Sequence, residues 1–184
     1  RGVRNTTAAT HSNGATVTNS SDYIAWGEAA SGDLVVDPGL WSIDNFGDKV
    51  IALIHNAQVF EWDSNATNAV TIRATIISGA PTASRDMLVS TPDRHLVFFG
   101  TETTIGTPST QDEMFIRFSN QEDINTYQPT AVNTAGTQRL ADGSKIVGAV
   151  RGRDAIYVWT DTSLFTMRFI GQPFTFGFQQ VGTN

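Results

Sequence analysis

The chain has 184 residues, a formal net charge of −6, 40% hydrophobic residues, 16% charged residues and no cysteine. That length suits one or two compact domains, and the hydrophobic fraction excludes an intrinsically disordered chain, which combines low hydrophobicity with high charge. The lack of cysteine excludes disulfides, thiolate catalysis and iron–sulfur clusters, and no apolar run approaches the ~18 residues of a membrane helix.

Residues 1–39 differ in composition from the rest of the chain. They are rich in Thr, Asn, Ser, Ala and Gly, and their apolar residues are scattered apart from short islands at 23–26 and 34–36. Such a segment cannot bury enough apolar surface to form a core by itself. We therefore expect an irregular arm or lead-in that gains order mainly through contacts outside the domain that follows.

From Leu40 onward, short apolar runs alternate with turn residues, which is typical of strands joined by tight turns. Met114, Ile116 and Phe118 recur at every second position and predict one buried strand face. Helical patterns are nearly absent, and only 121–125 suits a single turn. The pattern therefore predicts an all-β fold, with strands at 49–54, 58–62, 70–77, 86–90, 95–99, 113–118, 145–150, 155–160, 164–170 and 174–181.

One pattern occurs three times: an apolar strand, a polar turn and a strand that carries aromatic residues. The copies begin at positions 50, 87 and 146, so their average spacing is close to the roughly 40–50 residues of a propeller blade. The first and third copies are most alike, and we expect the hairpins 49–62 and 145–159 to be equivalent. The predicted architecture is a set of antiparallel β-propeller-like blades over residues 40–184, with a β-sandwich as the alternative.

Aromatic residues in the two most similar hairpins are predicted to be structural anchors. Phe60 stands two positions before Trp62, and Tyr157 two positions before Trp159, so that each pair lies on one face of its strand. We expect these rings in the core, where Trp→Ala at either tryptophan costs ~3–5 kcal/mol. Trp41, just before the first hairpin, is a further predicted anchor.

No catalytic, cofactor or metal site is predicted, and we expect a protein without enzymatic activity. His11, His55 and His95 lack the spacing of a metal-binding pair, and no nucleophile elbow, P-loop or dinucleotide fingerprint is present. The acidic balance argues against general nucleic-acid binding, which uses a basic patch. Most candidate carboxylates lie beside turn residues, where aspartate bonds its own backbone: Asp44, Asp48, Glu61, Asp63, Glu122, Asp123, Asp142, Asp154 and Asp161.

Two stretches carry a resemblance to a known family. One is LWSIDNFGDKVIALIHNAQVFEWD at 40–63, and the stronger is FSNQEDINTYQPTAVNTAGTQRLADGSKIVGAVRGRDAIYVWTDTSLFTMRFIG at 118–171. The second runs from a QED turn and a YQP bend through NTAG to a DGSKIVG strand. Both resemble the tail tubular or nozzle proteins that close the distal end of the tail in short-tailed bacteriophages. The resemblance covers roughly 40–184 and carries no catalytic motif.

This resemblance implies a structural protein of the virion, located in the phage tail. It would be one subunit of a ring, a hexamer, through which genomic DNA passes without specific binding. Its partners would be copies of itself and neighbouring tail proteins such as a tail adaptor, with no cofactor and no membrane span. Members of the family are usually longer, so we expect this chain to be the first part of such a protein.

A carbohydrate-binding or carbohydrate-degrading tail-associated β module is the alternative function. It predicts a groove lined with exposed aromatic residues and two carboxylates within catalytic range of each other. The structural function predicts instead a large surface between subunits.

Overall fold

The computed structural model describes residues 9–10, 16–17, 40–67, 69, 71–91 and 93–183. The chain divides into two compact units, 1–39 and 40–184. In the first unit, β1 (Ala9–Thr10) and β2 (Thr16–Val17) pair antiparallel. The apolar islands of this unit and His11 lie outside the described residues, so the expectations placed on them stay predictions.

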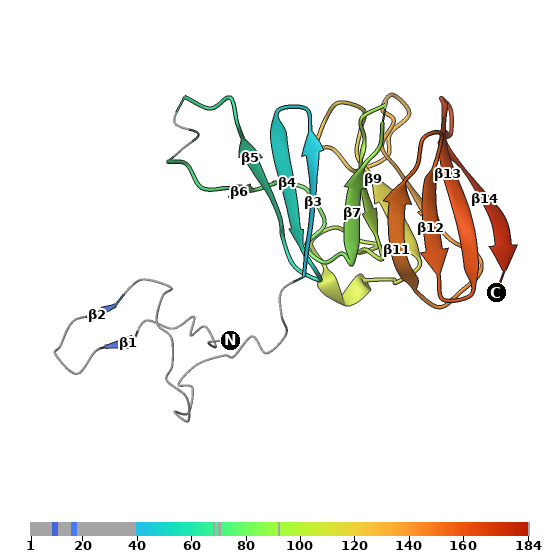
Figure 1. Ribbon diagram of the computed structural model, residues 1–184, viewed down its shortest axis with the longest axis horizontal. Coiled ribbons are helices and arrows are strands. Elements are labelled where there is room, and N and C mark those ends of the chain that lie inside the picture. The colour runs from blue at the N-terminus through green and yellow to red at the C-terminus, as the bar shows by residue number, and fades with distance from the viewer. Residues whose placement is uncertain are drawn as a thin grey trace. The chain divides into compact units, whose positions relative to one another are not determined.

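The second unit contains three four-stranded antiparallel sheets, and in each of them the strands follow chain order (Figure 1). The first sheet consists of β3 (Trp41–Phe46), β4 (Lys49–Ile54), β5 (Val59–Asp63) and β6 (Thr75–Ile76). The second sheet consists of β7 (Asp86–Val89), β8 (Leu96–Phe99), β9 (Phe115–Phe118) and β10 (Gly136–Arg139). The third sheet consists of β11 (Ile146–Arg151), β12 (Ile156–Thr160), β13 (Ser163–Gly171) and β14 (Thr175–Thr183). The predicted all-β class is confirmed, and the helical structure of the described residues is one 3₁₀ turn, η1 (Pro108–Thr110).

Most predicted strands are present, with ends shifted by one or two residues. The sequence pattern misses β3 and also β10, whose sequence Gly-Thr-Gln-Arg has no apolar face because it is an edge strand. The predicted strand 70–77 is too long, since only β6 forms within its described part. The helical turn expected at 121–125 is wrong: Glu122 has a φ of 57°, a left-handed conformation that interrupts a right-handed helix.

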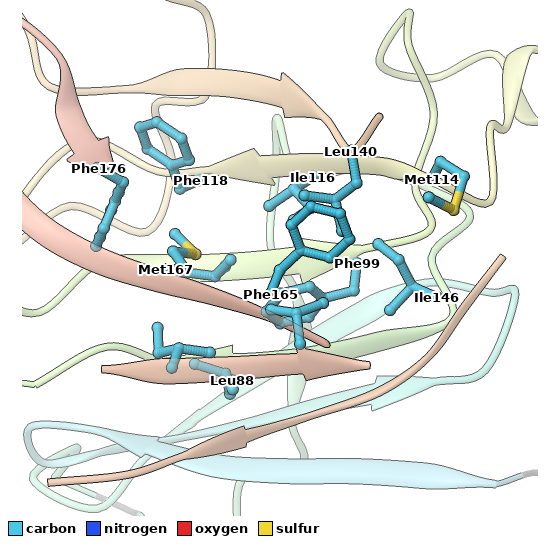
Figure 2. Packing of buried hydrophobic residues seen from close by; sticks show 13 residues of the cluster. Leu88, Phe99, Met114, Ile116, Phe118, Leu140, Ile146, Phe165, Met167 and Phe176 are labelled. Carbon is cyan, nitrogen blue, oxygen red and sulfur yellow. The ribbon is translucent and has the colours of Figure 1, made fainter. Parts of the chain in front are cut away.

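The second sheet lies between the other two, and each of its faces belongs to a different core (Figure 1). Every residue of β8 is fully buried, because successive side chains point to opposite faces and both faces are covered. The core shared with the third sheet includes Met114, Ile116 and Phe118, which confirms the predicted buried face. In Figure 2, Phe99 and Leu88 of the second sheet pack beside Phe165 and Met167 of the third.

A second core joins the first and second sheets. From the first sheet it receives Phe46, Ile51, Leu53 and Val59, and from the second Met87, Val89, Leu96 and Phe98. Tyr127, from the loop between β9 and β10, closes this core with its ring 5.6 Å from that of Phe98. Its hydroxyl donates to the carbonyl of Ile124 at 2.6 Å, so the buried phenol keeps a hydrogen-bond partner.

The first strands of the three sheets meet at a junction formed by Asp44, Val89 and Arg151. The Asp44 carboxylate on β3 accepts the backbone N–H of Val89 on β7 at 2.9 Å. It also accepts the guanidinium of Arg151 on β11 at 2.8 Å, and the same guanidinium donates to the Val89 carbonyl at 2.6 Å. One aspartate and one arginine therefore link all three sheets.

The two hairpins expected to be equivalent occupy different places. Hairpin 49–62 contains β4 and β5, the second and third strands of its sheet, whereas 145–159 contains β11 and β12, the first and second. The predicted equivalence is therefore wrong, because the positions of the two hairpins in their sheets differ by one strand. The apolar and aromatic alternation that suggested it recurs in any strand with a covered face, and it carries no information on the place of that strand in its sheet.

Candidate interaction surfaces

The predicted aromatic anchors lie on the outward faces of the first and third sheets, away from both cores. Trp159 is 41% exposed and Trp62 lies half-buried on the outward face of its sheet, so the prediction that these two tryptophans are core anchors is wrong. Trp41, the further predicted anchor, is 55% exposed. Phe60, Trp62 and Tyr157 are half-buried. The expected sharing of one face is confirmed for β12, where the rings of Tyr157 and Trp159 lie 6.3 Å apart.

Alternation along β12 explains this correction. Ile156, Val158 and Thr160 are buried and point toward the core, which leaves Tyr157 and Trp159 on the opposite side. Alternation along a strand separates its residues into two faces. In β12 one face carries Ile156 and Val158 and the other carries Tyr157 and Trp159, so both faces have large apolar groups. Which of the two is covered depends on the neighbouring sheet.

The outward side of the first sheet is an apolar surface, here called the first-sheet face. Trp41 pairs with Ile54, Ile43 with Ala52, and Val50 with Trp62 across the strands. The rings of Trp41 and Phe60 lie 6.5 Å apart, and Ile43 is 65% exposed. The face has no charged member and is formed by Trp41, Ile43, Asn45, Val50, Ala52, Ile54, Phe60, Trp62 and Ile76.

The outward side of the third sheet, here called the third-sheet face, has a different surface shape. One row across the four strands reads Gly148, Trp159, Leu164 and Gly182. A Cβ at either glycine would meet no atom within 4 Å, so open space flanks the row at both ends. A hollow of about 300 Å³ lies at this row and is lined by Trp159, Leu164 and Gly182 and by the polar turn between β12 and β13, including Asp161 and Thr162. The other members are Val150, Tyr157, Thr166, Arg168, Gly177 and Gln179.

Both described histidines and most of the described carboxylates form hydrogen bonds or ion pairs within the fold. No group of three or more metal-ligating side chains occurs within the described ranges. The Nδ1 atom of His55 lies 2.9 Å from the carbonyl of Arg85. Asp161 accepts the backbone N–H of Ser144 at 2.8 Å, and Asp142 accepts Gln180 at 3.0 Å. These two contacts join segments distant in sequence, whereas Asp63 and Asp123 bond their own turns, as expected, by accepting the backbone N–H groups of Asn65 and Asn125 at 2.8 Å.

Asp93 and His95 form a fully enclosed polar pair under the third sheet. Nδ1 of His95 lies 2.8 Å from an Asp93 oxygen, and the Ser90 hydroxyl donates to the same oxygen at 2.5 Å. Because the carboxylate lies between serine and histidine, this histidine has no contact through which to take the serine proton, and the group is not a nucleophilic triad. The imidazole packs against Phe118, Phe169 and Phe176.

Burial by itself would raise the pKa of Asp93, but the hydrogen bonds from His95 and Ser90 outweigh it and hold that pKa below its ordinary value. The charged carboxylate therefore contributes stability above about pH 4, the unfolded pKa, and this contribution is lost as pH falls through the lower folded pKa.

We expect Asp93→Asn to lower the free energy of unfolding by roughly 1–3 kcal/mol at pH 7 and by clearly less at pH 2 to 3. Urea denaturation of both proteins at each pH measures this difference. An equal loss at both pH values would show that the ionised carboxylate contributes nothing.

A polar groove lies at one end of the first and second sheets, and a second concavity of about 320 Å³ lies between the second and third sheets beside Asp93, Arg151 and Phe169. The polar groove has a volume of about 350 Å³ and is lined by Asp48, Lys49, Asp63, Arg94, Glu122 and Asp123, among others. Arg94 and Glu122 pair across it at 3.1 Å. Its apolar lining, Phe46 and Ile124, is buried. The groove therefore lacks the exposed aromatic platform that the carbohydrate alternative predicts.

Two polar clusters that hold the fold together were not predicted from the sequence: the Asp44–Arg151 junction and a buried Glu102–Arg117 cluster. The Glu102 carboxylate accepts the backbone N–H groups of Thr82 at 3.1 Å and Gly106 at 2.6 Å. Arg117 donates to the carbonyls of Thr103 at 2.8 Å and Tyr127 at 3.3 Å. In the sequence, the local signal for the Glu102–Arg117 cluster is the position of Arg117 between Ile116 and Phe118, two core residues of β9.

Comparison with protein-family models, with curated proteins and with solved structures found no match. Among the described residues, no helix has the length and apolar character needed to cross a membrane.

Proposed function

We propose that this chain is a structural protein of a phage virion, a nozzle-like tail subunit that forms part of the conduit for DNA ejection. The observation that carries the proposal is the resemblance of 40–63 and 118–171 to tail nozzle proteins. The first stretch covers β3 to β5, and the second runs from the end of β9 through β13. The two similar stretches thus include strands of all three sheets.

The proposal includes a propeller-type arrangement of the three sheets. A propeller blade is a four-stranded antiparallel sheet in chain order, and blades repeat around a central axis. The order of strands in all three sheets agrees with this, as does the meeting of their first strands at Asp44, Val89 and Arg151. A two-layer sandwich is supported less, because the second sheet is covered on both faces.

The charge of the chain suits a conduit. A net charge of −6 repels phosphate, so that DNA can pass without being held, whereas a basic wall would retain it. In this proposal the chain acts by assembly, without enzymatic activity. Copies of it form a ring, a hexamer by the family resemblance, next to other tail proteins such as an adaptor.

Immunoelectron microscopy of phage particles, with antibodies raised against the purified chain, tests the proposal. We expect label at the distal end of the tail, and antibody preabsorbed with the chain is the control. Label confined to the head, or absent from particles that contain the chain by mass spectrometry, would contradict a nozzle position. Cleavage of host polysaccharides by the purified chain, lost when a carboxylate pair is replaced, would favour the carbohydrate alternative.

A further inference from the structure

We propose that the cavity between the second and third sheets binds an organic cation, a primary ammonium group on a short aliphatic stem. The cavity has a volume of about 320 Å³, which is near the lower end of the range of small-molecule sites, about 300–1,000 Å³. It is lined by the turn between β7 and β8, by the turn between β11 and β12, and by parts of β13 and β14. The nozzle function proposed above does not use this cavity.

Asp93 supplies a negative charge to the lining of this cavity. It is 5% exposed, and the hydrogen bonds from Ser90 and His95 both reach its Oδ2 atom. Within the described part of the chain, no residue other than Asp93 itself donates to Oδ1. Burial raises the pKa of Asp93, but the bonds from His95 and Ser90 outweigh it and keep the carboxylate ionised at neutral pH. A cation that donates a hydrogen bond is the ligand that such a carboxylate oxygen takes most favourably.

The remaining lining suits both the ammonium group and its stem. Phe169 is 42% exposed, so part of its ring is open to a ligand, and aromatic rings attract ammonium groups. Met167 and Phe176, which belong to the core shared with the second sheet (Figure 2), add apolar contact area. A cation with an aliphatic stem can therefore place its charge at Asp93 and bury its methylene groups against apolar side chains.

The charges around the cavity favour a cation over an anion. Arg151 lines the cavity, but its guanidinium donates to Asp44 and to a backbone carbonyl, so its charge is already paired. Arg153 and Asp154, in the turn between β11 and β12, carry opposite charges that offset each other. Among the described residues, no arginine or lysine pairs with Asp93. An anion would therefore meet the Asp93 carboxylate with no cationic side chain reserved for it.

Titration of the isotope-labelled chain with n-butylammonium chloride at pH 7, followed by NMR, tests the site. We expect saturable shifts of the signals of Asp93, Phe169 and their neighbours. Titration with n-butanol, an uncharged molecule of nearly the same length, should give much weaker shifts, because the hydroxyl brings no positive charge to Asp93. Sodium chloride at the same concentrations controls for ionic strength.

Three variants separate the contributions to binding. Asp93→Asn removes the charge and keeps the shape, so it should weaken n-butylammonium binding at least about tenfold. Phe169→Leu should weaken it about two- to fivefold through loss of the aromatic ring. Asp154→Asn, the matched control at an exposed aspartate of the same cavity, should change it by less than about threefold. Thermal unfolding shows which variants are folded, and if Asp93→Asn is not, the contrast between the two probes on the parent chain decides.

Equal shifts with both probes, unchanged binding to folded Asp93→Asn, or shifts confined to residues away from the cavity would each overturn the site. N-acetyl-lysine methylamide distinguishes the two sources of an ammonium group. If it binds as tightly as n-butylammonium, the cavity takes a lysine side chain of a partner protein. If only n-butylammonium binds, the cavity takes a small free amine.

Discussion

Phe98→Ala is expected to lower the free energy of unfolding by about 3–5 kcal/mol. The ring of Phe98 is fully buried on β8 and lies against Tyr127 with centroids 5.6 Å apart. It belongs to the core that joins the first and second sheets. Its removal leaves a cavity between two sheets held by strands on both sides, which cannot easily collapse. Equilibrium denaturation in urea measures the loss.

Phe174→Ala is the matched control, since it is the same substitution at a ring that is 74% exposed in the turn before β14. We expect a change within about 0.5 kcal/mol. Losses of similar size at the two positions would contradict the assignment of Phe98 to a tightly packed core.

Arg117→Met is expected to destabilise the protein by about 3–5 kcal/mol, because it removes a buried charge whose partners stay buried. Arg117 is 2% exposed and Glu102 is fully buried. Burial lowers the pKa of Arg117, and the nearby charge of Glu102 opposes this. Without the guanidinium, the carbonyls of Thr103 and Tyr127 lose their donor and the Glu102 carboxylate loses its neighbouring positive charge.

Arg153→Met tests the same change at an exposed arginine in the turn between β11 and β12, and we expect it to be nearly neutral. The double variant Arg117→Met with Glu102→Gln should recover part of the loss, because no unpaired charge then remains in the interior. A double variant as unstable as the sum of its parts would show that the two residues act independently.

The sequence by itself determined the class of the fold and the position of most strands. These are local properties. The alternation of Met114, Ile116 and Phe118, and the turn at 55–57 between β4 and β5, depend on neighbours a few residues away. The strand β10 could not be found in this way, because an edge strand of Gly, Thr, Gln and Arg needs no apolar face. The expected absence of a catalytic site stays a prediction.

The tertiary structure decided which strand faces are covered and how the sheets are joined. The sequence pattern predicts Trp159 as a core residue. In the structure the second sheet packs against the face of β12 that carries Val158, so Trp159 lies on the uncovered face. Asp44 and Arg151 stand 107 positions apart, and their contact depends on three sheets meeting at their first strands. Such contacts arise from packing between distant segments, for which alternation within one strand carries no information.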